Sequence, residues 1–179
     1  MENNGIGKLF EGVDRWTVLI YVLIVLVGFV AILSASYEEG AESIFSFSHF
    51  YMKQLVWMGI SFAVAVVVLL VDASIYHKWA YLFYVLGLLT LVAALLFGRE
   101  VNGAKAWFEI GSVRIQPVEF AKIATALALA RVMSSSSFSI NRAGDLFKVG
   151  LVICLPLLII VMQNDTGSGI VLVSLLFVL

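Results

Sequence analysis

The sequence of 179 residues is poor in charge and in cysteine. Charged residues make up 13% of it and the formal net charge is −1, whereas soluble domains are about 25% charged. Because there is no basic run to attract a phosphate backbone, we expect no nucleic-acid partner. The single cysteine, Cys154, excludes an internal disulfide, and its apolar neighbours predict a small core residue rather than a reactive thiol.

Apolar residues take the place of the missing charge. They make up 62% of the chain, with a mean hydropathy of +1.05, which indicates an integral membrane protein because soluble domains are only about half apolar. Runs long enough to cross a bilayer predict the first, second, third and fifth spans at residues 16–35, 54–71, 80–97 and 146–162, and an alanine-rich fourth span is predicted before the last of these, at 117–133. The predicted fold class is therefore all-α, a polytopic transmembrane helix bundle forming a single membrane domain over residues 1–179.

The two ends of the sequence bear on the number of spans. A final apolar run begins near Gly167 and is only about a dozen residues long at Leu179, too short to span. We therefore expect five full spans, a truncated sixth, and a sequence that is the N-terminal part of a larger protein. Residues 34–36 resemble a cleavage site, but the first apolar run is longer than the roughly 7–15 residues of a signal peptide, so a retained span is favoured.

Basic residues predict the orientation. They gather before the first span, between the second and third, and between the fourth and fifth: Lys8, Arg15, Lys78, Arg131, Arg142 and Lys148. Since lysine and arginine favour the cytoplasmic side, we expect a cytoplasmic N-terminus. Residues 98–116 then lie outside, although Arg99, Lys105 and Arg114 run against this bias, which suggests a local purpose for them.

The segment 102–122, NGAKAWFEIGSVRIQPVEFAK, holds five charged side chains between two predicted spans: Lys105, Glu109, Arg114, Glu119 and Lys122. Pro117 is predicted to begin a helix, because its missing N–H would be unpaired there anyway. Glu119 then lies in the first turn, where a carboxylate complements the helix dipole. That structural explanation and a functional role for Glu119 are equally supported.

Lys122 lies three residues further on, on the same face as Glu119 and one turn deeper. A charge at such depth usually faces a bundle interior or a water-filled cavity; the alternatives are a lysine that snorkels to the surface or a mutual ion pair with Glu119. Alanines at positions 124, 126, 128 and 130 predict close packing and a buried helix, which favours function. Upstream, residues 102–103 predict a turn and residues 107–112 a short structured lid.

Asp165 lies between the fifth and sixth predicted spans, in the sequence Asp-Thr-Gly. An aspartic protease is rejected because that chemistry needs a second aspartate nearby to share a proton. Asp165 either caps the sixth helix or supplies an acidic group near the charged segment.

The charged residues together suggest a class of ligand. Lys105, Arg114 and Lys122, with Glu119 and Asp165, suit an anionic headgroup on a lipid tail, since cations bind phosphates and carboxylates orient cations or act on hydroxyls. These residues alone do not separate an enzyme from a transporter. An ion-coupled transporter would be expected to show inverted repeats and broken helices, and the sequence shows neither.

Two stretches resemble a known family. NGAKAWFEIGSVRIQPVEFAKIATALALA is similar to the signature segment of the SEDS family, the polytopic bacterial proteins of cell shape, division and sporulation. QNDTGSGIVLV is similar to its second motif, usually Gln-Pro-Asp-Leu-Gly-Thr, although Asn164 replaces the proline and Ser168 stands where threonine is common. The stretch around Val118 is closer to the RodA elongation branch than to the FtsW division branch, where serine is usual.

The resemblance implies a peptidoglycan glycosyltransferase of about ten spans that polymerises lipid II at the bacterial cytoplasmic membrane. It also implies a class B penicillin-binding protein as partner, and a catalytic acid beyond Leu179, so that this fragment alone would be inactive. The substrate cavity would include Lys105, Trp107, Arg114, Glu119, Lys122 and Asp165. A divalent cation is compatible with this chemistry, but no ligand cluster identifies one. A lipid II flippase and a non-catalytic scaffold for the penicillin-binding protein are the alternatives.

Overall fold

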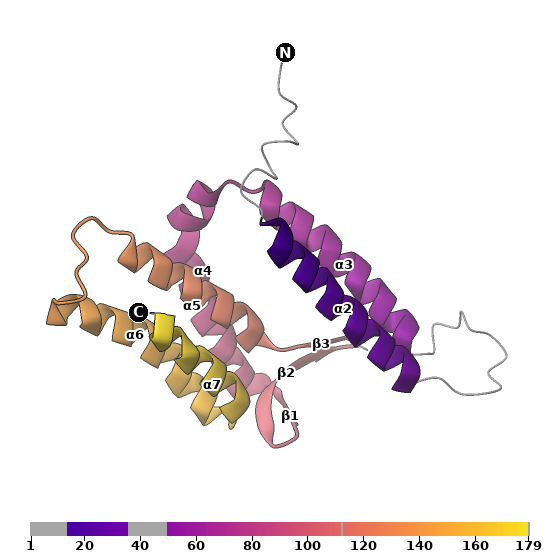
Figure 1. The fold of residues 1–179 in the computed structure, drawn as a ribbon. Helices are drawn as coiled ribbons and strands as arrows, with labels where there is room; N and C mark the ends of the chain where they lie inside the picture. The colour runs from indigo at the N-terminus through magenta and orange to yellow at the C-terminus, as the bar shows by residue number, and fades with distance from the viewer. Residues whose placement is uncertain (1–13, 36–49, 112, 179) are drawn as a thin grey trace, which may run out of the picture. The chain divides into compact units, whose positions relative to one another are not determined.

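The computed structural model of the chain describes residues 14–35, 50–111 and 113–178. The chain divides into two compact units, Met1–Asp72 and Ala73–Leu179. Four helices in the described part are long and apolar enough to cross a membrane (Figure 1): α2 (Arg15–Ala35), α3 (Phe50–Leu70), α4 (Ala73–Phe97) and α6 (Ala143–Met162). The prediction of a mostly helical membrane protein is confirmed, while the number of spans and the single domain stay predictions.

In the first unit, α2 begins at a capped end and then buries none of its side chains. The backbone N–H groups of Trp16 and Thr17 donate to the Asp14 carboxylate at 3.2 and 3.1 Å, and the Thr17 hydroxyl donates to it at 2.6 Å. These bonds, the Thr17 hydroxyl foremost, hold the pKa of Asp14 below its usual value. The cap satisfies amide groups that a helix start leaves unpaired.

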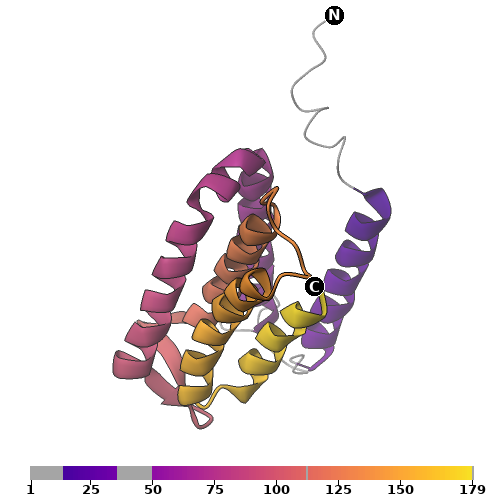
Figure 2. The same cartoon turned by 90° about the vertical axis from the view of Figure 1, so that its left-hand side faces the viewer.

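In the second unit, four helices lie side by side with a small sheet at one end (Figures 1 and 2). They are α4, α5 (Pro117–Met133), α6 and α7 (Thr166–Ser174), and the 3-10 helix η1 (Leu175–Val178) follows α7. The observed start and end of α5 match the prediction. At 17 residues it lies at the short limit for a spanning helix, about 17–25 residues.

Helices α4 and α5 pack most closely where their side chains are small. A Cβ atom added to Gly87 of α4 would lie 3.3 Å from the Ala121 Cα and 3.4 Å from the Ala124 Cβ of α5. Such close approach lets two helices gain contact energy in lipid, where burial of apolar surface drives nothing. Gly87 therefore fixes the distance between these helices.

The prediction that α5 is buried holds for one of its faces only. Ala124 and Ala128 are buried against other helices, whereas Ala126 and Ala130 are exposed. The large side chains of Phe120 and Ile123 are also exposed, on another face. The predicted burial is thus correct for Ala124 and Ala128, which are four residues apart and share one helix face, and wrong for Ala126 and Ala130.

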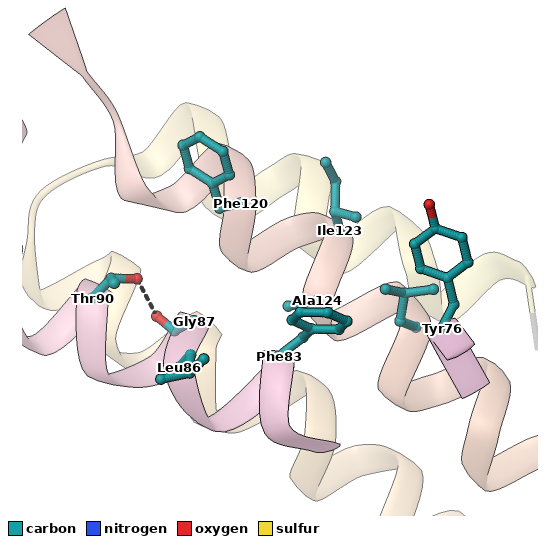
Figure 3. A pocket seen from close by; sticks show the side chains of 9 residues that line it. Tyr76, Phe83, Leu86, Gly87, Thr90, Phe120, Ile123 and Ala124 are labelled. Atoms are coloured by element: carbon teal, nitrogen blue, oxygen red, sulfur yellow. Dashed lines mark hydrogen bonds between the residues drawn. The ribbon is translucent and has the colours of Figure 1, made fainter. Parts of the chain in front are cut away.

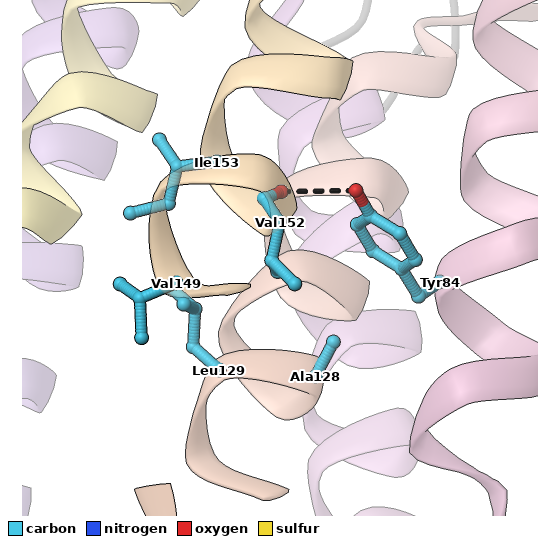
Figure 4. Packing of buried hydrophobic residues seen from close by; sticks show 6 residues of the cluster. All are labelled: Tyr84, Ala128, Leu129, Val149, Val152 and Ile153. Carbon is cyan, nitrogen blue, oxygen red and sulfur yellow. Dashed lines mark hydrogen bonds between the residues drawn. The ribbon is translucent and has the colours of Figure 1, made fainter. Parts of the chain in front are cut away.

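The core between α4, α5 and α6 contains one hydrogen bond that compensates for a proline (Figure 4). Pro156 lies inside α6 and has no N–H, so the carbonyl of Val152 one turn earlier loses its usual helical partner. The buried Tyr84 hydroxyl of α4 donates to that carbonyl at 3.0 Å. Apolar residues surround the bond: Ala128, Leu129, Val149 and Ile153. The prediction that Cys154 belongs to the core is wrong, because its position on α6 turns it outward and exposes it.

The sheet was not anticipated by the all-α prediction. Strands β1 (Arg99–Val101), β2 (Ala104–Ile110) and β3 (Val113–Ile115) pair antiparallel in that order. Asn102 and Gly103, both with positive φ, form the predicted turn between β1 and β2. The segment expected to form a structured lid is thus a strand of this sheet up to Ile110, and Ser112 lies outside the described residues.

Candidate functional site

Lys105 joins the sheet to two helix ends. Its backbone N–H donates to the Gln163 carbonyl at 2.9 Å, which ties β2 to the end of α6. Its ammonium group donates to the Leu96 carbonyl at 3.2 Å, near the end of α4, where helical carbonyls lack partners. The contacts of Lys105 therefore hold the sheet in place, and its side chain remains exposed.

Gln163 is the most enclosed polar residue at this end of the unit, with 1% of its surface exposed. Its Nε2 donates to the Leu91 carbonyl of α4 at 2.8 Å, while its Oε1 is buried without a hydrogen-bond partner among the described residues. The site prediction omitted Gln163. The sequence held one clue to it, a polar side chain at the end of an apolar run. If such an amide is buried, it must be hydrogen-bonded, so its position matters to the fold.

Asp165 caps α7, which confirms one of the two predictions made for this residue. Its Oδ1 accepts from the Ser168 N–H at 3.2 Å, and its Oδ2 accepts from the Gln116 Nε2 at 2.8 Å. The second bond joins the start of α7 to the residue that precedes α5. Both oxygens are thus engaged in positioning helices, and a role toward a substrate stays a prediction.

Asn164, which replaces the usual proline, occupies a left-handed position with φ of 62°. Its N–H donates to the Val161 carbonyl at 3.0 Å, and the N–H of Asp165 donates to the Ile160 carbonyl at 3.2 Å, the pattern of a Schellman helix end. Proline has no N–H and is fixed near φ of about −65°. A chain with proline here needs a different local turn.

The start of α5 places an ion pair at the same end. Gln116 has extended backbone angles, and Pro117 is the first helical residue, as predicted. Lys122 donates to the Glu119 carboxylate at 2.9 Å, and the exposed fractions of the two side chains are 21% and 57%. The mutual ion pair that the sequence allowed is therefore present, with the cation as its less exposed member.

On the sheet, one carboxylate binds two arginines. Glu109 of β2 accepts from Arg114 of β3 at 2.8 Å and from Arg99 of β1 at 2.6 Å. Trp107 lies two residues before Glu109 and is paired with Arg99 across the strands. The site prediction omitted Arg99 and Glu109. A clue was present, because the alternation of polar and apolar residues over 104–110 is the pattern of a strand.

The predicted site residues share one end of the second unit but form separate groups: Glu119 with Lys122, Asp165 with Gln116, Arg114 with Glu109, and Lys105 with main-chain carbonyls. No hydrogen bond or ion pair between described residues joins Lys105, Arg114 and Lys122 to a common partner. The arrangement offers several cations and carboxylates at the end of a helix bundle. It suits electrostatic binding of an anionic group more directly than covalent chemistry.

An apolar groove lies between α4 and α5 (Figure 3). It encloses about 300 Å³, and its walls include Phe83, Phe120 and Ile123. Its lining contains two polar side chains, Tyr76 and Thr90, and the Thr90 hydroxyl donates to the Gly87 carbonyl at 2.8 Å. The other lining residues are apolar.

A metal site is not found in the described part of the chain, where no three histidine, cysteine, aspartate or glutamate side chains are arranged to hold an ion. The carboxylates at the candidate site are bonded to cations, an amide or a helix N–H instead. The described residues therefore supply no set of free carboxylates for a divalent cation, and a cation held with groups elsewhere in the complete protein stays a prediction.

The fold and the site define a polytopic membrane protein with the predicted site residues at one end of a helix bundle. The family model described as a cell cycle protein, which covers FtsW, RodA and SpoVE, matches residues 14–179. The chain belongs to this family, and the resemblance seen in the sequence is confirmed.

Relatives with printed functions are similar over much of the chain. It is 28% identical to the probable peptidoglycan glycosyltransferase FtsW of Thiomicrospira cyclica, covering 94% of this chain and 45% of the relative. It is 38% identical to the peptidoglycan glycosyltransferase RodA of Treponema pallidum, covering 72% and 30%. It is 32% identical to the stage V sporulation protein E of Bacillus subtilis, covering 90% and 45%. The chain thus spans less than half the length of these relatives.

Solved structures agree with the fold. The crystal structure of the Thermus thermophilus rod shape determining protein RodA matches with a TM-score of 0.78 and 29% identity, covering 91% of this chain and 51% of that one. A chain of a peptidoglycan synthase complex, described as coordinating polymerization and crosslinking, matches with a TM-score of 0.76 and 28% identity, covering 91% and 45%. These matches show that the arrangement of helices is that of the family.

Proposed function

We propose that the complete protein is a peptidoglycan glycosyltransferase that polymerises lipid II at the bacterial membrane. Relatives of both main branches carry the name of that activity. The observation that supports it best in the structure is the Lys122–Glu119 pair at the start of α5, whose cation is largely enclosed beside a charged sheet. An enclosed cation of this kind suits a pyrophosphate headgroup.

In the proposed reaction, the anomeric carbon of the growing glycan is transferred to the 4-hydroxyl of a sugar in lipid II. The bond from that carbon to the pyrophosphate oxygen breaks, undecaprenyl pyrophosphate leaves, and the hydroxyl proton passes to a base. Lys122, Arg114 and Lys105 are proposed to offset the negative charge that develops on the leaving group. The base is proposed to be a carboxylate beyond Leu179.

The remaining site residues are proposed to shape the cavity. Trp107 is proposed to offer an aromatic face to a sugar or an isoprenoid group. It belongs to β2, the strand that also carries Glu109. Glu119 orients Lys122, and Asp165 holds the starts of α5 and α7 together through Gln116. The sheet is proposed to lie on the outer face of the membrane, with the N-terminus in the cytoplasm.

A role in cell elongation and a class B penicillin-binding protein as partner complete the proposal. The relative named RodA is 38% identical, which supports the elongation branch, while relatives named FtsW match longer stretches at lower identity. The similarity to a chain of a peptidoglycan synthase complex supports a partner that crosslinks the product.

The test is polymerisation of labelled lipid II by the complete protein with its penicillin-binding partner. We expect Lys122→Ala and Arg114→Ala to lower the rate by about 100-fold, as does removal of other groups that stabilise developing charge. Lys148→Ala is the matched control, because Lys148 forms the same i,i+3 ion pair at 2.9 Å with Asp145 at the other end of the bundle. It should leave the rate nearly unchanged.

Normal glycan synthesis by both site variants would remove the assigned site. A wild-type protein that moves lipid II across vesicles but makes no glycan would instead replace the proposed function with that of a flippase.

A further inference from the structure

Two arginines on the outer strands of the sheet share a single carboxylate on the central strand. Arg99 Nη1 lies 2.6 Å from one oxygen of Glu109, and Arg114 Nε lies 2.8 Å from the other. The side chains of Arg99 and Arg114 are 74% and 61% exposed, whereas that of Glu109 is 18% exposed. The carboxylate is thus a partly covered anchor for two outward guanidinium groups.

The register of the strands explains this arrangement. Glu109 lies directly opposite Arg114, and Arg99 lies opposite Trp107, two positions along β2. Residues two apart on a strand share a face, so these side chains are on one side of the sheet. Ala106, which alternates with them, is buried. The arginines therefore lie on the face away from the buried side of β2.

Stability alone does not account for the second arginine. Exposed ion pairs contribute little to folding, so a second arginine on the other oxygen of Glu109 adds little stability. Two guanidinium charges against one carboxylate leave one net positive charge on this face. The bonds use Nη1 of Arg99 and Nε of Arg114, and the other guanidinium nitrogens of both side chains are unbonded among the described residues.

The position of the pair relates it to the membrane surface. Arg99 begins β1 only two residues after α4, a membrane-spanning helix, ends at Phe97. The phosphate groups of membrane lipids lie at the end of such a helix. Planar guanidinium forks match the oxygens of phosphate, and forks held in advance lose less freedom on binding.

We propose that Arg99 and Arg114, held side by side by Glu109, form a binding site for the phosphate group of a membrane-anchored lipid. Only the identity of that lipid, one bearing a pyrophosphate, rests on the proposed function. Arg99 is the residue that this site adds, because the predicted site residues did not include it.

The experiment measures lipid binding by the complete protein in phosphatidylcholine nanodiscs. One arm adds undecaprenyl pyrophosphate and the other adds phosphatidylglycerol, with bound lipid counted by native mass spectrometry. We expect Arg99→Gln to raise the apparent Kd for undecaprenyl pyrophosphate about tenfold, and Arg99→Lys, which keeps the charge but not the fork, to raise it about threefold. Arg142→Gln, which removes an exposed arginine from the opposite end of the unit, should leave it unchanged.

The two arms identify the source of the phosphate. Weaker binding of undecaprenyl pyrophosphate alone supports a pyrophosphate site, and equal weakening of both lipids supports a general lipid phosphate site. Unchanged binding of both lipids by Arg99→Gln, in a variant with the thermal stability of the wild type, would overturn the inference. Polymerisation of lipid II is measured separately, so a protein that makes no glycan but loses lipid binding on Arg99→Gln would refute the proposed function and leave this site in place.

Discussion

Helices α2 and α5 are both built from apolar residues, yet they use them differently. In α2, no side chain is buried, large side chains such as Leu19 and Ile24 are exposed, and a Cβ on Gly28 would find nothing within 4 Å. In α5, small side chains such as Ala121 and Ala124 are buried, close to Gly87 of α4. The apolar bulk of α2 lies where lipid is the solvent, whereas contact between protein helices relies on the absence of bulk.

This difference separates two properties that a hydropathy profile combines. A strongly apolar helix is suited to lipid but carries no instruction about its neighbours. A helix rich in alanine is less suited to lipid and specifies its neighbour by shape. Substitutions at matched positions in the two kinds of helix therefore distinguish solvation from packing.

The largest effect is expected from Gly87→Leu. The Cβ atom of the new side chain would lie 3.3 Å from the Ala121 Cα and 3.4 Å from the Ala124 Cβ. The rest of the leucine has no room beyond it, so α4 and α5 must separate. We expect a loss of about 2–3 kcal/mol in the free energy of unfolding, as for other overpacked cores. Unfolding of the chain in dodecylmaltoside with increasing dodecyl sulfate measures it. Gly28→Leu makes the same change in α2 and should not destabilise; equal losses in both variants would show that packing does not distinguish these helices.

A smaller effect is expected from Tyr84→Phe. It removes the hydroxyl that donates to the Val152 carbonyl, which Pro156 leaves without a helical partner. We expect a loss of about 1 kcal/mol, typical of a buried hydrogen bond. In a Pro156→Ala background the carbonyl regains a backbone N–H, so Tyr84→Phe should cost less there. The same unfolding assay on the four proteins of this cycle tests the coupling, and strictly additive losses would contradict it.

The smallest effect is expected at the start of α2. Thr17 and the first amides of the helix lower the pKa of Asp14 below its ordinary value. The cap therefore stabilises the folded state fully at pH values above the pKa that this carboxyl has in the unfolded chain. This contribution is lost as pH falls through the lowered folded value. Asp14→Ala should therefore destabilise most at pH 7, and its effect should shrink as pH falls through the lowered folded pKa of Asp14. Asp14→Asn keeps a capping side chain without the titration, so the difference in stability between Asp14→Asn and Asp14→Ala should not change with pH.

The sequence was sufficient for features that depend on neighbouring residues. Pro117 set the start of α5, and Asp165 was among the residues suited to cap α7, because both effects are local. The contact between Arg99 and Glu109 was not predictable in the same way. It depends on the turn at residues 102–103 and on a register shift between Arg99 and Glu100, which only the paired strands define.

Other parts of the site also required the packed structure. Lys122 was predicted to face a cavity, to snorkel to the surface or to pair with Glu119, and the packed structure shows the pair. The exposure of Cys154 depends on which face of α6 meets α4 and α5, and an apolar run that is uniform around the helix does not indicate this.

The close contact of α4 and α5 at Gly87 has a consequence for how the chain enters the membrane. In α5 alanine is the commonest residue, and Glu119 and Lys122 lie near its start, so during synthesis it gains less from partitioning into the bilayer than the leucine-rich α4 before it. The surface of α4 around Gly87 offers it a ready partner, and the sheet that joins them is short. Insertion of α5 is thus expected to follow α4 as one half of a helical hairpin, with the earlier helix as its template.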